Sequence, residues 1–194
     1  GGGRDENGPF LLFEALAGAT LDEVLEKVDA TSVAGALHTV ATLAGASDLV
    51  RYDAASGARS VLIAAERLVA KPGAAALAIE DYAFSADEAR VLIFTNTRKV
   101  WRQNTRGDYW VLELGSDALR KLGGDAPEAS LMFAKLSSDG TRAGYVRAND
   151  LWVEDLASGA ITRLTSTGSA TSINGTSDWV YEEEFDLRDA WRWS

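Results

Sequence analysis

The sequence has no cysteine and a single histidine, His38, among its 194 residues. The absence of cysteine excludes disulfides, thiolate metal sites and cysteine nucleophiles. One histidine argues against a structural zinc site and against a histidine-based catalytic triad within the chain. No Gly-x-Ser-x-Gly motif marks a nucleophilic serine either. We therefore expect no catalytic residue, no metal site and no cofactor in this chain.

Basic residues are also scarce, with 19 Lys and Arg against 29 Asp and Glu and a formal net charge of -10. Binding to phosphates needs clustered Lys and Arg, so the charge argues against nucleic acid as a partner and favours a cationic ligand. No apolar run approaches the roughly 18 residues of a membrane span. The opening residues, GGGRDENGPF, lack the apolar stretch of a signal peptide.

Three segments of the sequence align without gaps. They are DLVRYDAASGARSVL from Asp48, DYWVLELGSDALRKL from Asp108 and DLWVEDLASGAITRL from Asp150. Each has an alternating apolar run, then a small polar turn, then a second short run that ends in Leu. Alternation with period two indicates half-buried strands, and the turn residues favour a hairpin.

A second repeat alternates with the first one. YAFSADEARVLIF from Tyr82 and AKLSSDGTRAGYV from Ala134 both contain Ser-x-Asp-x-x-Arg between two apolar runs. Asp and Ser side chains favour such turns because they hydrogen-bond the neighbouring backbone. Two kinds of hairpin that alternate about every 50 residues predict an all-β fold, a β-propeller of four-stranded antiparallel blades.

The predicted propeller region covers residues 35–194, after an N-terminal segment of residues 1–34. In that segment Thr20 and Glu23 could form a capping box for a short helix. Residues 30–47 are expected to include strands of the first blade, and residues 64–78 an inter-blade loop. The final residues, WRWS, match the start of another Ser-x-Asp hairpin. We therefore expect the native ring, here incomplete, to continue beyond this chain.

The most unusual segment is SDWVYEEEFDLRDAW, from Ser177 to Trp191. Successive residues of a strand point to opposite faces, so neighbouring carboxylates converge only on a helical turn or an irregular loop. The simplest interpretation is a solvated acidic surface. The flanking aromatic residues suggest instead a packed segment that holds an ammonium group, whose three donors two carboxylates can satisfy.

A second segment, TRKVWRQNTRGDYW, is rich in basic residues and has two interpretations. In one, Lys99, Arg102 and Arg106 are solvated on a strand that leaves a blade. In the other, one guanidinium reaches a carbonyl or carboxylate, for which its planar fork is suited.

The heptapeptide Asp178-Trp179-Val180-Tyr181-Glu182-Glu183-Glu184 resembles a specific motif of the dipeptidyl peptidase IV family. Val100-Trp101-Arg102, followed by Tyr109-Trp110-Val111, is similar to that family's Trp-Arg segment. The resemblance covers roughly residues 35–194. It implies an eight-bladed propeller that caps an α/β-hydrolase domain, which would follow this chain and supply the nucleophilic Ser with its Asp and His.

The resemblance also implies roles for individual residues. Glu183 and Glu184 would bind the N-terminal ammonium of a peptide. Arg102 would bind the carbonyl side of the peptide's P2 residue. The supporting residues would be Glu182, Trp101, Asp178 and Tyr181. The expected activity is release of N-terminal Xaa-Pro or Xaa-Ala dipeptides, with the propeller restricting access by large folded proteins.

The same resemblance implies partners and a compartment. The partners are peptides with a free N-terminus, the hydrolase domain of the same protein and, since the family often dimerises, a second copy. The alanine-rich composition favours a bacterial protein that is periplasmic or secreted, with the cytoplasm as the alternative. Two other functions stay open. One is a propeller homologue that acts as a binding scaffold without catalysis. The other is a relative of the acylaminoacyl peptidases or oligopeptidases, which the pair Glu183-Glu184 disfavours because those enzymes do not need paired glutamates.

Overall fold

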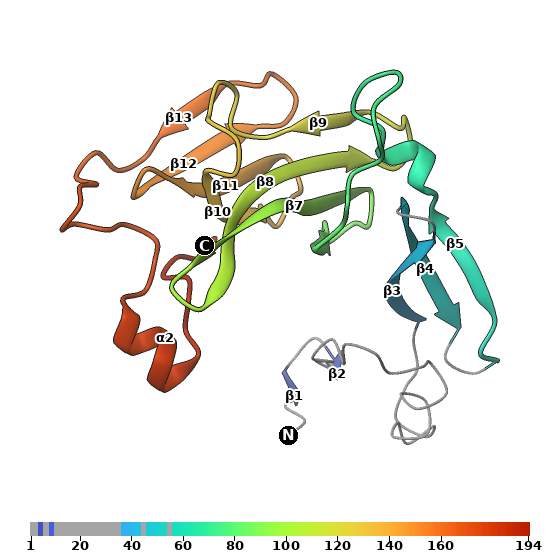
Figure 1. Ribbon diagram of the computed structural model, residues 1–194, viewed down its shortest axis with the longest axis horizontal. Coiled ribbons are helices and arrows are strands. Elements are labelled where there is room, and N and C mark those ends of the chain that lie inside the picture. The colour runs from blue at the N-terminus through green and yellow to red at the C-terminus, as the bar shows by residue number, and fades with distance from the viewer. Residues whose placement is uncertain (1–3, 6–7, 10–35, 44–45, 54–55) are drawn as a thin grey trace. The chain divides into compact units, whose positions relative to one another are not determined.

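The computed structural model describes residues 4–5, 8–9, 36–43, 46–53 and 56–194 (Figure 1). The chain divides into two compact units, the first formed by residues 1–41 and 48–63 and the second by residues 42–47 and 64–194. The helix expected after Thr20 and the boundary expected at residue 34 lie outside the described residues, so the two-part division stays a prediction.

The N-terminal strands form a short ribbon and a small antiparallel sheet. Strands β1 (Arg4–Asp5) and β2 (Gly8–Pro9) pair with each other, and β3 (Ala36–Leu43), β4 (Ala46–Asp53) and β5 (Arg59–Ile63) form a sheet in that order. The turn between β4 and β5 has Gly57 at a φ of 69°, and its N–H donates to Asp53 O over 2.8 Å. The strands expected within residues 30–47 and the hairpin expected from Asp48 are confirmed.

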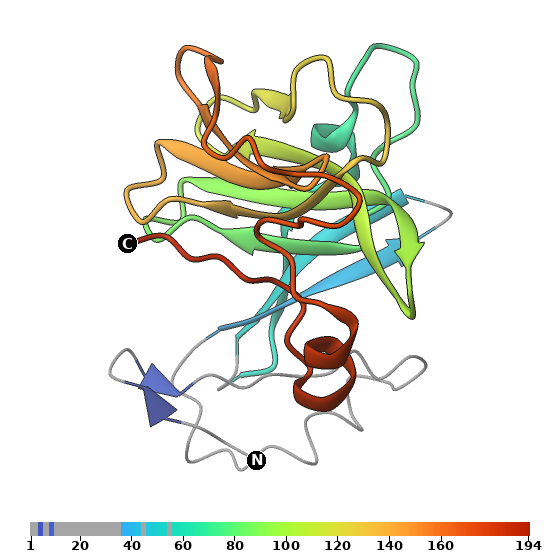
Figure 2. The same ribbon diagram turned by 90° about the vertical axis from the view of Figure 1, so that its left-hand side faces the viewer.

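The second unit consists of two four-stranded antiparallel blades (Figures 1 and 2). The strands of the first are β6 (Asp81–Phe84), β7 (Arg90–Val100), β8 (Gln103–Glu113) and β9 (Leu119–Lys121); those of the second are β10 (Leu131–Leu136), β11 (Arg142–Arg147), β12 (Asp150–Asp155) and β13 (Ile161–Arg163). Pairing of Leu131 with Gly107 and of Met132 with Arg106 joins β10 to β8. The predicted blades of alternating hairpins are therefore confirmed, and residues 64–78 form a connection with one 3₁₀ turn, Ala65–Leu68.

The two Ser-x-Asp turns have the same hydrogen bonds. In the first blade, Ser85 Oγ donates to Asp87 Oδ1 over 2.6 Å and accepts from Arg90 N over 2.9 Å. In the second blade, Ser137 Oγ donates to Asp139 Oδ1 over 2.6 Å and accepts from Arg142 N over 3.0 Å. The serine hydroxyl thus closes each hairpin by linking the turn carboxylate to the returning strand.

The main core lies between the two blades. It is formed by buried residues from both, namely Leu92, Tyr109, Val111, Leu122, Leu131, Ala143 and Tyr145. Val91, Leu92 and Ile93 are all at most 3% exposed, so this part of β7 is covered on both faces. The second blade covers one of these faces, since Leu92 belongs to the core that the two blades share.

The aspartates that open the second and third repeats are structural. Asp108 is 6% exposed and accepts hydrogen bonds from Asn96 and the Ala129 N–H, while Asp150 is 1% exposed and accepts from Thr165, Asn174 and the Gly168 N–H. Each also pairs with a cation on the next strand, Lys121 and Arg163 respectively. Both carboxylates fasten a loop to a strand, so the shared Asp of these two repeats has a role in folding.

Among the described residues, no helix is long and apolar enough to cross a lipid bilayer. Among the same residues, no three His, Asp or Glu side chains gather in a way that could hold a metal ion.

Candidate functional site

The hairpin between β7 and β8 carries Trp101 and Arg102 at its tip. Val100 pairs with Gln103, so these two residues alone form the turn. Trp101 has a φ of 54°, a left-handed conformation that two-residue hairpins normally assign to Gly or Asn. A bulky residue there is strained by an energy on the order of 1 kcal/mol or more. The turn directs the Arg102 side chain away from the blade, where it is 71% exposed.

The acidic segment forms a short helix, α2 (Trp179–Phe185). Asp178 caps its first turn, since its carboxylate accepts a hydrogen bond from the Tyr181 N–H over 3.0 Å. Asp186 ends it in a left-handed conformation with a φ of 52°. The helix explains how consecutive glutamates can serve one region, because successive side chains are rotated by only about 100° around a helix.

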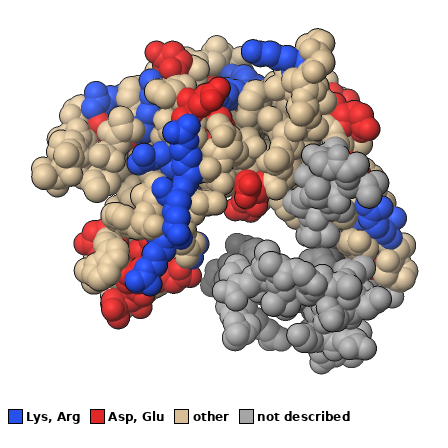
Figure 3. Space-filling view, in the orientation of Figure 1, with Lys and Arg blue, Asp and Glu red and all other residues tan. Residues whose placement is uncertain are grey.

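The structure brings the two predicted segments together. Arg102 Nη1 lies 2.9 Å from Glu183 Oε2, although the residues come from a hairpin tip and a helix that are far apart in the sequence. Figure 3 shows basic and acidic side chains meeting over the α2 region. The Glu183 side chain is 17% exposed, whereas Arg102 is largely in solvent. Because such a solvated pair is worth at most about 1 kcal/mol, it orients the two side chains more than it stabilises the fold.

The other two glutamates of the motif differ in environment. Glu184 is exposed, and Glu182 is half-buried. The Oε1 atom of Glu182 is buried and has no hydrogen-bond partner among the described residues. Glu184 is therefore free to meet a ligand from solvent, and the role of Glu182 as a support stays a prediction.

The expectation that the flanking aromatic residues pack around the glutamates is wrong. Trp179, Tyr181 and Phe185 are 53%, 52% and 64% exposed, and Trp101 is 45% exposed. The rings of Tyr181 and Phe185 lie 5.7 Å apart and contact mainly each other. Their apolar surface is therefore not what holds α2 in place.

What holds α2 is the backbone at its two ends and the segment that follows it. Thr176 forms a β-bridge with Asp189, and the Ser177 N–H donates to Arg188 O over 2.9 Å. Lys135 of β10 pairs with Asp189 and also donates to Trp191 O over 2.8 Å. These contacts fasten the loop that carries α2 to the second blade.

Asp189 is the charged centre of this attachment. Burial by itself would raise the pKa of the Asp189 carboxyl, but Lys135 and Arg192 more than offset burial and lower it. The rings of Trp191 and Trp193 pack directly against Gly144. A Cβ atom at that position would come within 2.7 Å of the Trp191 ring. Sequence reasoning missed this contact between Lys135 and Asp189, because 54 positions separate the two residues and no local pattern links them.

Comparison with known proteins matches the part of the chain that carries both segments. Residues 85–194, more than half of the chain, match the family described as the dipeptidyl peptidase IV N-terminal region. The probable dipeptidyl-aminopeptidase B of Neosartorya fischeri is 34% identical over 100 residues, which are 52% of this chain and 11% of that protein. The protein of that name from Trichophyton verrucosum is 32% identical over 111 residues, which are 57% of this chain and 12% of that protein.

Among solved structures, the crystal structure of Porphyromonas gingivalis dipeptidyl peptidase 4 is similar to 78% of this chain, with a TM-score of 0.66 and 26% identity. The matched part is 21% of that protein, and the chain spans only about a ninth of the length of the curated relatives. The family match over residues 85–194 includes β7 to β13 and α2. The chain therefore belongs to the dipeptidyl peptidase IV N-terminal region family.

Proposed function

We propose that the full-length protein is a serine exopeptidase that releases N-terminal dipeptides, and that this region binds the free N-terminus of the peptide. The observation that carries the proposal is the 2.9 Å contact between Arg102 and Glu183. It unites a cation suited to peptide carbonyls with a carboxylate suited to an ammonium group, beside the exposed Glu184.

The charges of this group match a peptide N-terminus. Glu183 and Glu184 carry two negative charges and Arg102 carries one positive charge, so the three residues together have a net charge of about -1. A single ammonium group neutralises that charge. Arg102 uses one nitrogen for Glu183, which leaves other guanidinium N–H groups to donate to a carbonyl oxygen.

The proposed mechanism is positioning. If two carboxylates fix the ammonium at a set distance from a nucleophile, only the second peptide bond reaches the reacting position. Binding energy at the N-terminus is thereby used to orient the scissile bond. The nucleophile, its base and the pocket for Pro or Ala would belong to a hydrolase domain outside these 194 residues.

The first test is hydrolysis of a Gly-Pro chromogenic amide by the full-length protein, with the amine either free or acetylated. Cleavage of the free form alone supports the proposal. Equal cleavage of both would contradict the ammonium site and favour an oligopeptidase. Absence of cleavage of either by a folded protein would favour a propeller that binds peptides without catalysis.

The second test compares matched carboxamide variants. We expect Glu184→Gln to lower kcat/KM for the free-amine substrate by about 2–4 kcal/mol, because the ammonium loses one charged partner. Glu128→Gln is the control, since Glu128 is also exposed but lies in the loop between the blades. A loss of less than about tenfold in the Glu184 variant, or roughly 1.4 kcal/mol, would count against the assignment.

A further inference from the structure

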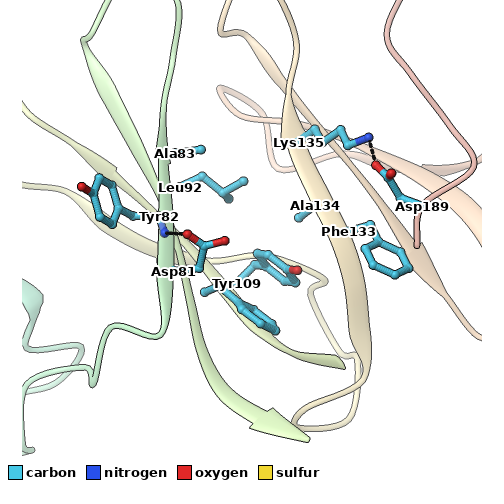
Figure 4. Close-up of a pocket in the computed structure, with 10 residues that line it drawn as sticks. Asp81, Tyr82, Ala83, Leu92, Tyr109, Phe133, Ala134, Lys135 and Asp189 are labelled. Carbon is cyan, nitrogen blue, oxygen red and sulfur yellow. Dashed lines mark hydrogen bonds and ion pairs between the residues drawn. The ribbon is translucent and has the colours of Figure 1, made fainter. Parts of the chain in front are cut away.

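A hollow lies between the two blades and the segment that follows α2 (Figure 4). It has two adjoining lobes of about 180 and 430 Å³. Both lobes are lined by the same five residues, namely Asp81, Phe94, Tyr109, Phe133 and Asp189. They come from β6, β7, β8, β10 and the segment after α2, so the hollow is built by the folded unit and not by one local motif.

Aromatic rings form the walls of this hollow. Phe94 and Tyr109 stack with their ring centroids 4.6 Å apart and their planes at 24°. Phe133 comes from the opposite blade (Figure 4). It lies in the irregular part of the β10–β11 pairing, between Met132 and Lys135, and has a φ of 51°. That left-handed conformation is rare for a large side chain, and it places the ring at the hollow at a cost in backbone energy.

One acidic group at the hollow differs from the others. Asp189 is paired with Lys135 and Arg192, and Asp186 with Arg188. The Asp81 carboxylate accepts a hydrogen bond from the neighbouring Tyr82 N–H over 2.8 Å, and no Lys or Arg of the described residues forms an ion pair with it. It is exposed, and Figure 4 shows it on the same side of the hollow as Tyr109.

The electrostatics of the two tyrosines support this placement. Burial raises the pKa of the Tyr82 hydroxyl to about 12, and the Asp81 charge adds to the shift. Burial also raises the pKa of Tyr109, against the effect of the Ala134 and Phe133 N–H groups, and both Asp81 and Asp189 contribute to the increase. Asp81 therefore lies close enough to both tyrosines to act on their hydroxyl groups.

We propose that this aromatic hollow binds the guanidinium group of an arginine side chain in a peptide. The planar cation would stack on the Phe133 ring, pack beside the Phe94–Tyr109 pair and form a two-point hydrogen bond with Asp81. Arginine suits this geometry better than lysine, because its flat, weakly hydrated group both stacks on rings and presents a donor fork to a carboxylate. The site uses neither Glu183 nor Glu184, so it stands independently of the proposed ammonium site.

The test uses N-acetyl-arginine methylamide, whose blocked amine cannot engage Glu183 and Glu184. Its neutral control is N-acetyl-citrulline methylamide, which has nearly the same shape. We expect NMR titration of the full-length protein to show saturable binding of the arginine compound, with citrulline bound about tenfold more weakly, as for loss of one charge-assisted hydrogen bond. Asp81→Asn should reduce arginine binding to the citrulline level, while Glu128→Gln and Glu183→Gln should leave it unchanged.

A second variant tests the aromatic wall separately from the charge. Phe133→Leu keeps apolar bulk but removes the π face, and we expect it to weaken arginine binding by about two- to fivefold. Lack of saturable binding, equal binding of citrulline, or an Asp81→Asn variant that binds as tightly as the wild type would overturn the proposal. Tighter binding of the corresponding lysine compound would overturn the stacked guanidinium. None of these outcomes bears on the Gly-Pro amide assay, so the two proposals fail separately.

Discussion

Substitution of Asp108 by Asn should destabilise the second unit and remove part of its acid sensitivity. Asp108 lies in the middle of β8 and pairs with Thr95 of β7. Its Oδ1 accepts from the Ala129 N–H over 2.9 Å and lies 3.0 Å from Lys121 Nζ, and its Oδ2 accepts from Asn96 Nδ2 over 2.8 Å. The carboxylate therefore ties β7, β9 and the start of β10 to β8, on the hairpin that carries Arg102.

The size of the effect follows from these partners. Asparagine keeps one acceptor, and Asn96 can rotate its amide to restore a neutral hydrogen bond, so the charge assistance toward Lys121 and Ala129 is what disappears. We expect a loss of about 1.5–3 kcal/mol in the free energy of unfolding, the range for hydrogen bonds to charged groups. Asp108→Ala leaves three donors without a partner, and should cost about 3–5 kcal/mol.

The pH dependence gives a second readout. Burial would raise the pKa of Asp108, but Asn96, Ala129 and Lys121 more than offset it and lower the pKa. A lowered pKa in the folded state means that the stabilisation is complete above the unfolded value, about 3.9, and is lost as the pH falls through the folded value. The stability difference between wild type and Asp108→Asn should thus shrink below about pH 4.

Urea unfolding at pH 7 and at steps down to pH 3 measures both effects, with Glu128→Gln as the control at an exposed position. A loss of under about 0.5 kcal/mol at pH 7, the size of an ordinary surface substitution, would refute the reasoning. So would a difference that does not change with pH.

Three further predictions concern single positions. Gly144→Ala puts a Cβ atom within 2.7 Å of the Trp191 ring, so we expect altered tryptophan fluorescence and a higher KM for the free-amine substrate; unchanged values would mean that the segment adjusts freely. Trp101→Gly relieves a φ of 54° and should cost less than about 1 kcal/mol in urea unfolding, whereas more than about 2 kcal/mol would reveal a packed indole. Ser137→Ala removes the leading cause that lowers the pKa of Asp139 to about 2, so NMR titration should show a higher value, and a value still near 2 would contradict the assigned hydrogen bond.

The hairpins were predictable because their information is local. A Ser-x-Asp turn needs only a hydroxyl, a carboxylate and the next strand, and those groups lie within five residues, as in Ser85 to Arg90. For the glutamate motif, the sequence left a helical turn and an irregular loop as alternatives, since neighbouring carboxylates cannot converge on a strand, and the structure has the helix. The roles of Glu183, Glu184 and Arg102 were predicted only from the family resemblance. Of the three residues, the structure shows Arg102 and Glu183 in contact.

Other features could not be predicted, for a physical reason that they share. Aromatic side chains around a motif do not indicate which face will be covered, so the exposure of Trp179 and Phe185 contradicted the expected packing. The pair between Lys135 and Asp189 and the aromatic hollow join residues on different strands and loops. Their proximity depends on how two blades stack, and the period of a single segment carries no information about that.

The attachment of α2 has a consequence for how the glutamates are positioned. The helix has seven residues and none of them is buried, whereas isolated helices shorter than about 12 residues are marginal in water. Its geometry must then come from the Asp178 cap and from the flanking backbone, which Lys135 and Asp189 fasten to β10. The distance between Glu184 and Arg102 is accordingly set by the stacking of the two blades. A change in the core between the blades should thus alter recognition of the peptide N-terminus even when every residue that touches the peptide is intact.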